Sequence, residues 1–216
     1  MASQGAGAHR KGSAFELKVS KILSKWTGEH AMRVPSSGAN HQQKGEIRMI
    51  GDITFPVGSS NSFNYECKNH ESMQVKSVLM NNGNMPSFWE QATSDSRRVQ
   101  GKLLSPMLVF NISHDNIYIV VPYTKWLATQ LHSNQSPCQV QKTYYTHSLT
   151  DKLNEFDTIL TTLTALIALD HAEVFKHYFN IPWDRYNESS QSSEESEADI
   201  KRKGLDRITN IMEGIK

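Results

Sequence analysis

The sequence predicts an α/β fold in which a central mixed β-sheet has helices on its faces and is followed by a helical C-terminal extension. The first observation is that apolar residues recur at spacings of three and four from Phe15 to Trp26, which predicts an amphipathic helix. A second is a succession of short segments rich in β-branched and aromatic residues, joined in pairs by turn residues. A third is the helical segment 87–102, which lies between two such pairs. Strands and helices that alternate in this way are typical of a sheet covered by helices.

The elements follow in order from local sequence. We expect residues 1–11, which are rich in Gly and Ala, to form a flexible arm, and Ser13 to cap the first helix. A cluster of Pro, Gly, Ser and Asn over 33–45 predicts a loop. The predicted strands form two hairpins, 47–57 with 63–69 and 105–113 with 116–123. The predicted helices that remain in this part are 87–102, with Ser87 as its cap, and 124–133.

Composition indicates an intracellular protein that does not span a membrane. The hydrophobic fraction is 38% and the mean hydropathy is −0.53. No apolar stretch reaches the roughly 18 residues that a membrane span needs. The N-terminal segment lacks the apolar region of a secretion signal. Cys67 and Cys138 have neither metal-ligand spacing nor a disulfide pattern. We therefore expect an intracellular location, in the cytoplasm or nucleoid. For a viral protein, the cell in question would be the host cell.

The C-terminal third predicts several short regions after a core domain at 12–132. Within an extension at 133–187, apolar residues follow a 3-4-3-4 spacing that predicts a helix packed on the core, namely Leu153, Phe156, Leu160, Leu163 and Ile167. The acidic, Ser-rich segment 188–199 predicts a disordered linker. We expect a short terminal helix over 200–216, which is a candidate surface for a protein partner.

Two charged side chains interrupt the predicted strand 63–69. Side chains of a strand alternate between faces, so Glu66 and Lys68 share one face. The hairpin partner supplies Asp52, and cross-strand neighbours lie within roughly 5 Å. Two carboxylates at that distance repel each other unless a cation lies between them. Oxygen ligands favour Mg²⁺ or Mn²⁺ over zinc, and the backbone carbonyl of Cys67 is a further candidate ligand.

This pattern has two interpretations from the residues alone. The first is a simple salt bridge between Glu66 and Lys68 on an exposed strand face. The second is a centre for metal-assisted hydrolysis of a phosphodiester, in which the lysine orients a water molecule and stabilises developing negative charge. The position of Asp52 at the end of an apolar strand, followed by a turn and then Glu-x-Lys, favours the second interpretation.

The order of these motifs resembles the PD-(D/E)XK nuclease superfamily, and within it the archaeal-type and viral Holliday-junction resolvases. The resemblance covers roughly residues 10–122 and includes "RVPSSGA", "GD" at 51–52 and "ECK" at 66–68. Gly51 stands where the superfamily has its eponymous proline, and the loop between Gly38 and Gly51 is longer than in compact resolvases. The resemblance implies a restriction-endonuclease-like core.

It also implies roles for individual residues. Asp52 and Glu66 correspond to metal ligands, joined by Glu16 and the carbonyl of Cys67, and Lys68 to the catalytic lysine. Ser36 and Ser37 resemble the loop serine near the scissile phosphate, and Gln91 a polar helix residue that faces the site. Each of these residues also has an ordinary explanation, such as a solvated helix or turn position. The basic residues that we expect to contact DNA, or else to be plain surface charges, are Arg10, Lys11, Arg33, Arg97, Arg98 and Lys102.

The sequence therefore predicts a Mg²⁺- or Mn²⁺-dependent DNA endonuclease, with a branched-DNA resolvase as the favoured activity. Another nuclease of the same fold, for restriction or repair, and a non-catalytic DNA-binding protein with a degenerate site are the alternatives. A resolvase needs two opposed nicks, which predicts a homodimer. Its two candidate contact surfaces are the strand at 116–123, as an open sheet edge, and the helical seam from Leu153 to Ile167.

Overall fold

The computed structural model describes residues 4–34, 50–69, 74–99, 103–112, 116–147 and 150–184. The expected linker at 188–199 and the expected terminal helix at 200–216 lie outside these residues. None of the helices in these ranges is both long and apolar enough to cross a lipid bilayer.

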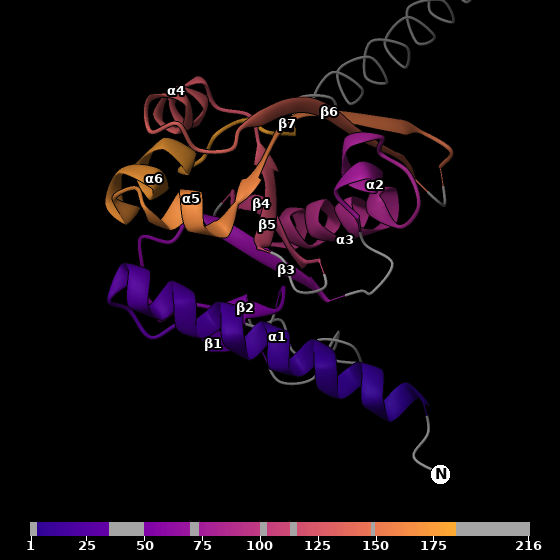
Figure 1. Ribbon diagram of the computed structural model, residues 1–216, viewed down its shortest axis with the longest axis horizontal. Coiled ribbons are helices and arrows are strands. Elements are labelled where there is room, and N and C mark those ends of the chain that lie inside the picture. Colours follow the sequence, from indigo (N-terminus) through magenta and orange to yellow (C-terminus); the bar gives the residue numbers. More distant parts are fainter. Residues whose placement is uncertain are drawn as a thin grey trace, which may run out of the picture. The chain divides into compact units, whose positions relative to one another are not determined.

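A mixed sheet of seven strands forms the centre of the domain (Figure 1), as the sequence predicts. Its spatial order is β1-β2-β3-β4-β5-β7-β6. Only β3 and β4 run parallel, and all other neighbours are antiparallel. The strands are β1 (Met32–Arg33), β2 (Ile53–Thr54), β3 (Phe63–Asn69), β4 (Ser105–Asn111), β5 (Ile117–Pro122), β6 (Gln139–Thr146) and β7 (Leu153–Thr162).

Helices cover both faces of this sheet, and each face has its own core. One core contains buried residues of α1 (Gln4–Thr27), α4 (Lys125–Ser133), α5 (Leu163–Ile167) and α6 (His171–Tyr178). The other contains buried residues of α2 (Val75–Leu79) and α3 (Met85–Arg98), which lie together in Figure 1. Trp89 of α3 is fully buried in the second core. The α/β architecture predicted from the sequence is confirmed.

Strand β3 has the predicted alternation. Phe63, Tyr65 and Cys67 belong to the core beneath α1. Their neighbours, among them Glu66 and Lys68, therefore face the side that α3 covers. This alternation separates an apolar face from the polar face on which the site is built.

The N-terminal part of the chain differs from the expected flexible arm. Helix α1 begins at Gln4, so Ser13 lies inside it and does not cap it. Ala and Lys favour helices, and a helix that is already nucleated extends at little further cost. The same kind of shift occurs at α3, which begins at Met85 after Asn84, with Ser87 inside its first turn.

The C-terminal extension contains two strands, and the second of them lies where the sequence predicted a helix. Residues 139–146 and 153–162 form β6 and β7, and helices begin only at Leu163. Four β-branched residues near the end of β7, Thr158, Ile159, Thr161 and Thr162, favour the extended conformation. The 3-4-3-4 spacing of apolar residues was therefore a misleading signal, and the predicted helical seam is wrong.

The two surfaces predicted for a dimer contact, an open edge at 116–123 and a helical seam, are not formed as the sequence predicted. Strand β5 is hydrogen-bonded to β4 and β7, so it is an interior strand rather than an open edge. Ile119 is fully buried. Leu160, from the supposed seam, lies in β7 and is also buried. Both expected contact surfaces are corrected by the topology of the sheet.

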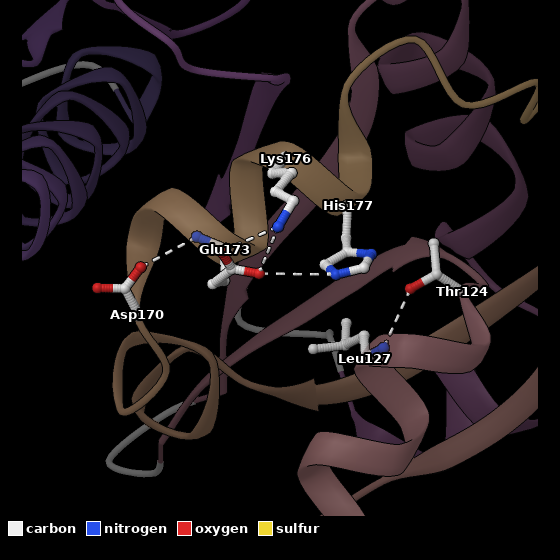
Figure 2. A network of polar contacts seen from close by, with 6 residues as sticks. All are labelled: Thr124, Leu127, Asp170, Glu173, Lys176 and His177. Atoms are coloured by element: carbon white, nitrogen blue, oxygen red, sulfur yellow. Dashed lines mark hydrogen bonds and ion pairs between the residues drawn. The ribbon is translucent and has the colours of Figure 1, made fainter.

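Side-chain caps fix the starts of α4 and α6 (Figure 2). Thr124 accepts a hydrogen bond from the backbone N–H of Leu127, and Asp170 accepts one from that of Glu173. The His177 ring also stacks on Trp126 of α4, with ring centroids 4.3 Å apart. This ring stacking joins α6 to α4.

Candidate catalytic centre

Gly51 and Asp52 are held between two strands. The backbone N–H of Asp52 donates to the carbonyl of Tyr65 at 2.8 Å, and its carbonyl accepts from Val34 at 2.9 Å. Gly51 has φ +78°, a conformation that proline cannot adopt. A Cβ on Gly51 would lie 2.9 Å from the Tyr65 carbonyl and closer still to the Asn64 side chain. Glycine in place of the superfamily's proline is therefore a requirement of this backbone.

Glu66 and Lys68 meet on the polar face of β3. The Lys68 Nζ lies 2.5 Å from Glu66 Oε1, and the Glu66 side chain is almost completely buried. The same ammonium donates to Oε1 of Gln91 at 2.8 Å and lies 5.2 Å from the centroid of the Phe88 ring. Gln91 and Phe88 both belong to α3. The structure thus brings Gln91, which the sequence predicted only to face the site, into contact with Lys68.

The environment of Glu66 is unfavourable for its ionised form. Burial, and after it the nearby charge of Asp52, raise the pKa of Glu66 to about 8, although Lys68 acts in the opposite direction. A carboxyl that is protonated near neutral pH has an unmet need for positive charge. Because Lys68 alone leaves the pKa this high, a divalent cation between Asp52 and Glu66 would relieve the remaining repulsion.

The donor atoms around this pair fit an oxygen-binding cation. Asp52 Oδ2 accepts the backbone N–H of Cys67 at 2.7 Å, which leaves Oδ1 for a cation. In a strand, the N–H and C=O of one residue point toward the same neighbour, so the Cys67 carbonyl also points toward Asp52. The Cys67 thiol is buried and its pKa is raised by that burial, so its sulfur is a poor ligand.

Within the described residues, no three His, Cys, Asp or Glu side chains surround a single point closely enough to bind a metal together. Mg²⁺ tolerates this, because it is usually held by one or two carboxylates and keeps several waters. The set formed by Asp52, Glu66 and the Cys67 carbonyl therefore suits Mg²⁺ or Mn²⁺ better than a metal that needs a full protein cage.

Glu16 lies near this centre, and its carboxylate is already paired. Its Oε2 is 2.5 Å from Nε of Arg33, and both side chains are mostly buried. The charge of Glu16 contributes to the raised pKa of Cys67, which places it near the strand that bears the site. The end of β3 is also joined to α1, because the Asn69 side chain donates to the Lys11 carbonyl at 3.3 Å. Arg33 thus holds Glu16 in place in addition to any contact with DNA.

The other predicted DNA contacts have varied positions. Arg98 is exposed and pairs with Asp95 at 3.0 Å. Arg97 donates to the Tyr145 hydroxyl at 2.7 Å and lies 5.8 Å from the centroid of the Trp183 ring, so its guanidinium is used in packing. Lys11 is exposed on α1. The positions of Ser36, Ser37, Lys102 and the Arg10 side chain lie outside what the structure describes.

Sequence reasoning missed one acid at this centre. Asp95 lies on α3 one helical turn after Gln91, with its side chain largely buried. Burial, with a further contribution from the charge of Asp52, raises the pKa of Asp95, and the charges of Arg98 and Lys68 partly offset this increase. The signal available in the sequence was the spacing of four residues from Gln91, which places both side chains on one helical face.

Comparison with known proteins gives one family. Residues 7–176, most of the chain, match the model of the family described as "Phage putative PDDEXK endonuclease". No curated protein sequence and no solved structure matched the chain. The matched range includes the seven strands of the sheet, α3, and α1 from residue 7 onward.

Proposed function

We propose, because the chain belongs to the phage PDDEXK endonuclease family, that it hydrolyses phosphodiester bonds of DNA with the help of Mg²⁺ or Mn²⁺. The observation that carries this proposal is the convergence of Asp52, Glu66 and Lys68 on one buried face, with the lysine held by Gln91. A degenerate descendant of a nuclease would be expected to have lost at least one of the three charged residues.

Each residue of the candidate centre has a separate role in the proposed hydrolysis. Asp52, Glu66 and the carbonyl of Cys67 would hold the divalent cation, which when bound supplies Lewis acidity and lowers the pKa of a bound water. Lys68 provides a positive charge for the negative charge that develops on the phosphate during attack. Gln91 holds the ammonium in position from α3. The ion pair of Glu16 with Arg33 would place a carboxylate of α1 near the cation and a guanidinium near the phosphate.

The experiment is metal-dependent cleavage of DNA by the full chain, three site variants and one control variant. Asp52→Asn and Glu66→Gln should each abolish cleavage in Mg²⁺ while DNA binding and folding persist. Lys68→Ala should lose turnover and still bind the cation. Asp157→Asn, a change on the exposed part of β7, serves as the matched acid-to-amide control. Near wild-type cleavage by Asp52→Asn or Glu66→Gln would show that the centre is elsewhere.

The finer proposal is that four-way DNA junctions are the preferred substrate. Its support is the resemblance of the motif order to junction resolvases, and it implies a dimer with two active sites. Cleavage of a four-way junction should be compared with that of a linear duplex of the same sequence, alongside sedimentation with and without the junction. A protein that stays monomeric on the junction, or that cuts both substrates equally, is a general DNA nuclease instead.

A further inference from the structure

Helix α3 covers strand β3 and runs antiparallel to it, and the distance between side chains on the facing side is similar in the two elements. At one end, Gln91 accepts the hydrogen bond from Lys68. At the other end, Val99, which follows α3 directly, and Asn64 line the same cavity. Four helical residues rise about 6 Å, and two strand residues rise about 6.6 Å. Each step of four along α3 therefore corresponds to a step of two backward along β3.

This register places Asp95 opposite Glu66. Asp95 is four residues after Gln91 and four before Val99, just as Glu66 lies midway between Lys68 and Asn64. The Asp95 side chain is only 17% exposed, so it points toward the sheet rather than into solvent. Its described ion pair is with Arg98, whose own side chain is 62% exposed. A largely buried carboxylate thus faces the acidic pair of the site from the opposite element.

We propose that Asp95 is a third carboxylate of the cation site and binds the cation through a water molecule. The inference rests on the proposed function and adds a residue to it. A water-mediated role follows because the acids within the described residues do not gather closely enough for three of them to touch one ion. Hydrated Mg²⁺ commonly donates hydrogen bonds from its waters to carboxylates that it does not touch.

Arg98, the ion-pair partner of Asp95, should have the opposite effect on cation binding. Its guanidinium neutralises part of the Asp95 charge from the exposed rim of α3. If Asp95 only held Arg98 in place, loss of either partner would disturb the site in the same way. If Asp95 helps to bind the cation, loss of Arg98 leaves its negative charge fully available to the hydrated cation. Loss of the Asp95 charge removes that interaction with the cation.

The experiment measures Mn²⁺ binding to the full chain by calorimetry, without DNA. Asp95→Asn should weaken Mn²⁺ binding about 10-fold, the lower end of the range for groups that act on a metal through its water or ligands. Arg98→Gln should bind Mn²⁺ as tightly as the wild type or more tightly. Asp157→Asn, a control on β7, which is separated from β3 by β4 and β5, should leave the affinity unchanged. Thermal unfolding of each variant in EDTA verifies that it is folded.

Three results would overturn the proposal. Unchanged Mn²⁺ affinity in folded Asp95→Asn would exclude Asp95 from the site. Equal weakening by Asp95→Asn and Arg98→Gln would show that their ion pair is structural. A wild-type chain that binds no Mn²⁺ would remove the proposed function together with this inference, whereas the first two results leave the proposed function intact.

Discussion

The Nζ of Lys68 lies 2.8 Å from the Oε1 of Gln91, which joins β3 to the helix that covers it. The same ammonium lies 2.5 Å from Glu66. A lysine has four rotatable side-chain bonds, so a single ion pair would leave its direction variable. The second contact, from a different element, fixes the direction of the ammonium, and under the proposed function this is the direction in which it would meet a substrate.

Gln91→Ala should therefore lower turnover more than substrate affinity. The ammonium keeps its charge and its ion pair with Glu66 but loses the group that orients it. Because small misplacements of catalytic groups are costly, we expect kcat to fall about 10- to 100-fold with little change in KM. Steady-state cleavage of a labelled duplex in Mg²⁺ measures both constants.

The control for this prediction is Ser87→Ala. Ser87 is exposed on the same helix and donates only to the carbonyl of Asn84. An equal effect of both changes would indicate that α3 as a whole was disturbed. An increase in KM with normal kcat in Gln91→Ala would instead assign Gln91 to substrate binding.

The raised pKa of Glu66 predicts a specific pH dependence of stability without metal. The pKa of Glu66 is about 8 in the folded protein and 4.5 as its ordinary value. Between these values the folded state keeps a proton that the unfolded state has lost. The contribution of Glu66 to stability is therefore full below pH 4.5 and is lost as the pH rises toward 8, with a slope of up to about 1.4 kcal/mol per pH unit.

Glu66→Gln should flatten this dependence, since the amide does not titrate. In EDTA, the free energy of unfolding of the variant should rise relative to that of the wild type between pH 5 and pH 8. Urea unfolding at several pH values measures the difference, and Asp157→Asn is the control. Parallel profiles for wild type and Glu66→Gln would mean that Glu66 is ionised in the folded protein throughout this range.

The sequence predicted those parts of the molecule whose signals are local. The limits of β3 and the grouping of Asp52, Glu66 and Lys68 follow from polar residues placed at alternate positions in an apolar strand. The strands β6 and β7 were missed, because apolar residues in β7 had a helical spacing and only its place inside the sheet shows that it is extended.

Asp95 was missed for a different reason. Its position opposite Glu66 depends on the register between α3 and β3, which no stretch of either element reveals alone. The pairing of Glu16 with Arg33 likewise depends on how α1 packs against the edge strand β1. Long-range pairings of this kind lie beyond patterns in a single sequence.

Gly51→Ala should destabilise the protein much more than Gly58→Ala. Both glycines have positive φ, +78° and +86°, so alanine is strained at either position. At Gly58 the added Cβ meets nothing within 4 Å, whereas at Gly51 it meets the Tyr65 carbonyl and the Asn64 side chain. We expect losses of about 1 kcal/mol at Gly58 and more than about 2 kcal/mol at Gly51 in urea unfolding. Equal losses would show that backbone strain alone requires the glycine before Asp52.

Arg97→Met should reduce stability and leave DNA affinity nearly unchanged. The Arg97 guanidinium donates to the Tyr145 hydroxyl at 2.7 Å and faces the rings of Phe156 and Trp183. A hydrogen bond from a charged donor and a cation–π contact together predict a loss of about 2 kcal/mol in the free energy of unfolding.

The comparison that tests this role is DNA binding in Ca²⁺, an ion used here to slow cleavage, with Arg97→Lys as a second variant. Arg97→Lys keeps the charge but loses the planar stacking group, so it should be almost as unstable as Arg97→Met. If Arg97 instead contacts phosphate, Arg97→Met should weaken DNA binding several-fold and flatten its salt dependence, while Arg97→Lys restores most of both. Stability and affinity therefore change separately under the two roles, and the structure favours the loss of stability because the guanidinium is turned toward Tyr145.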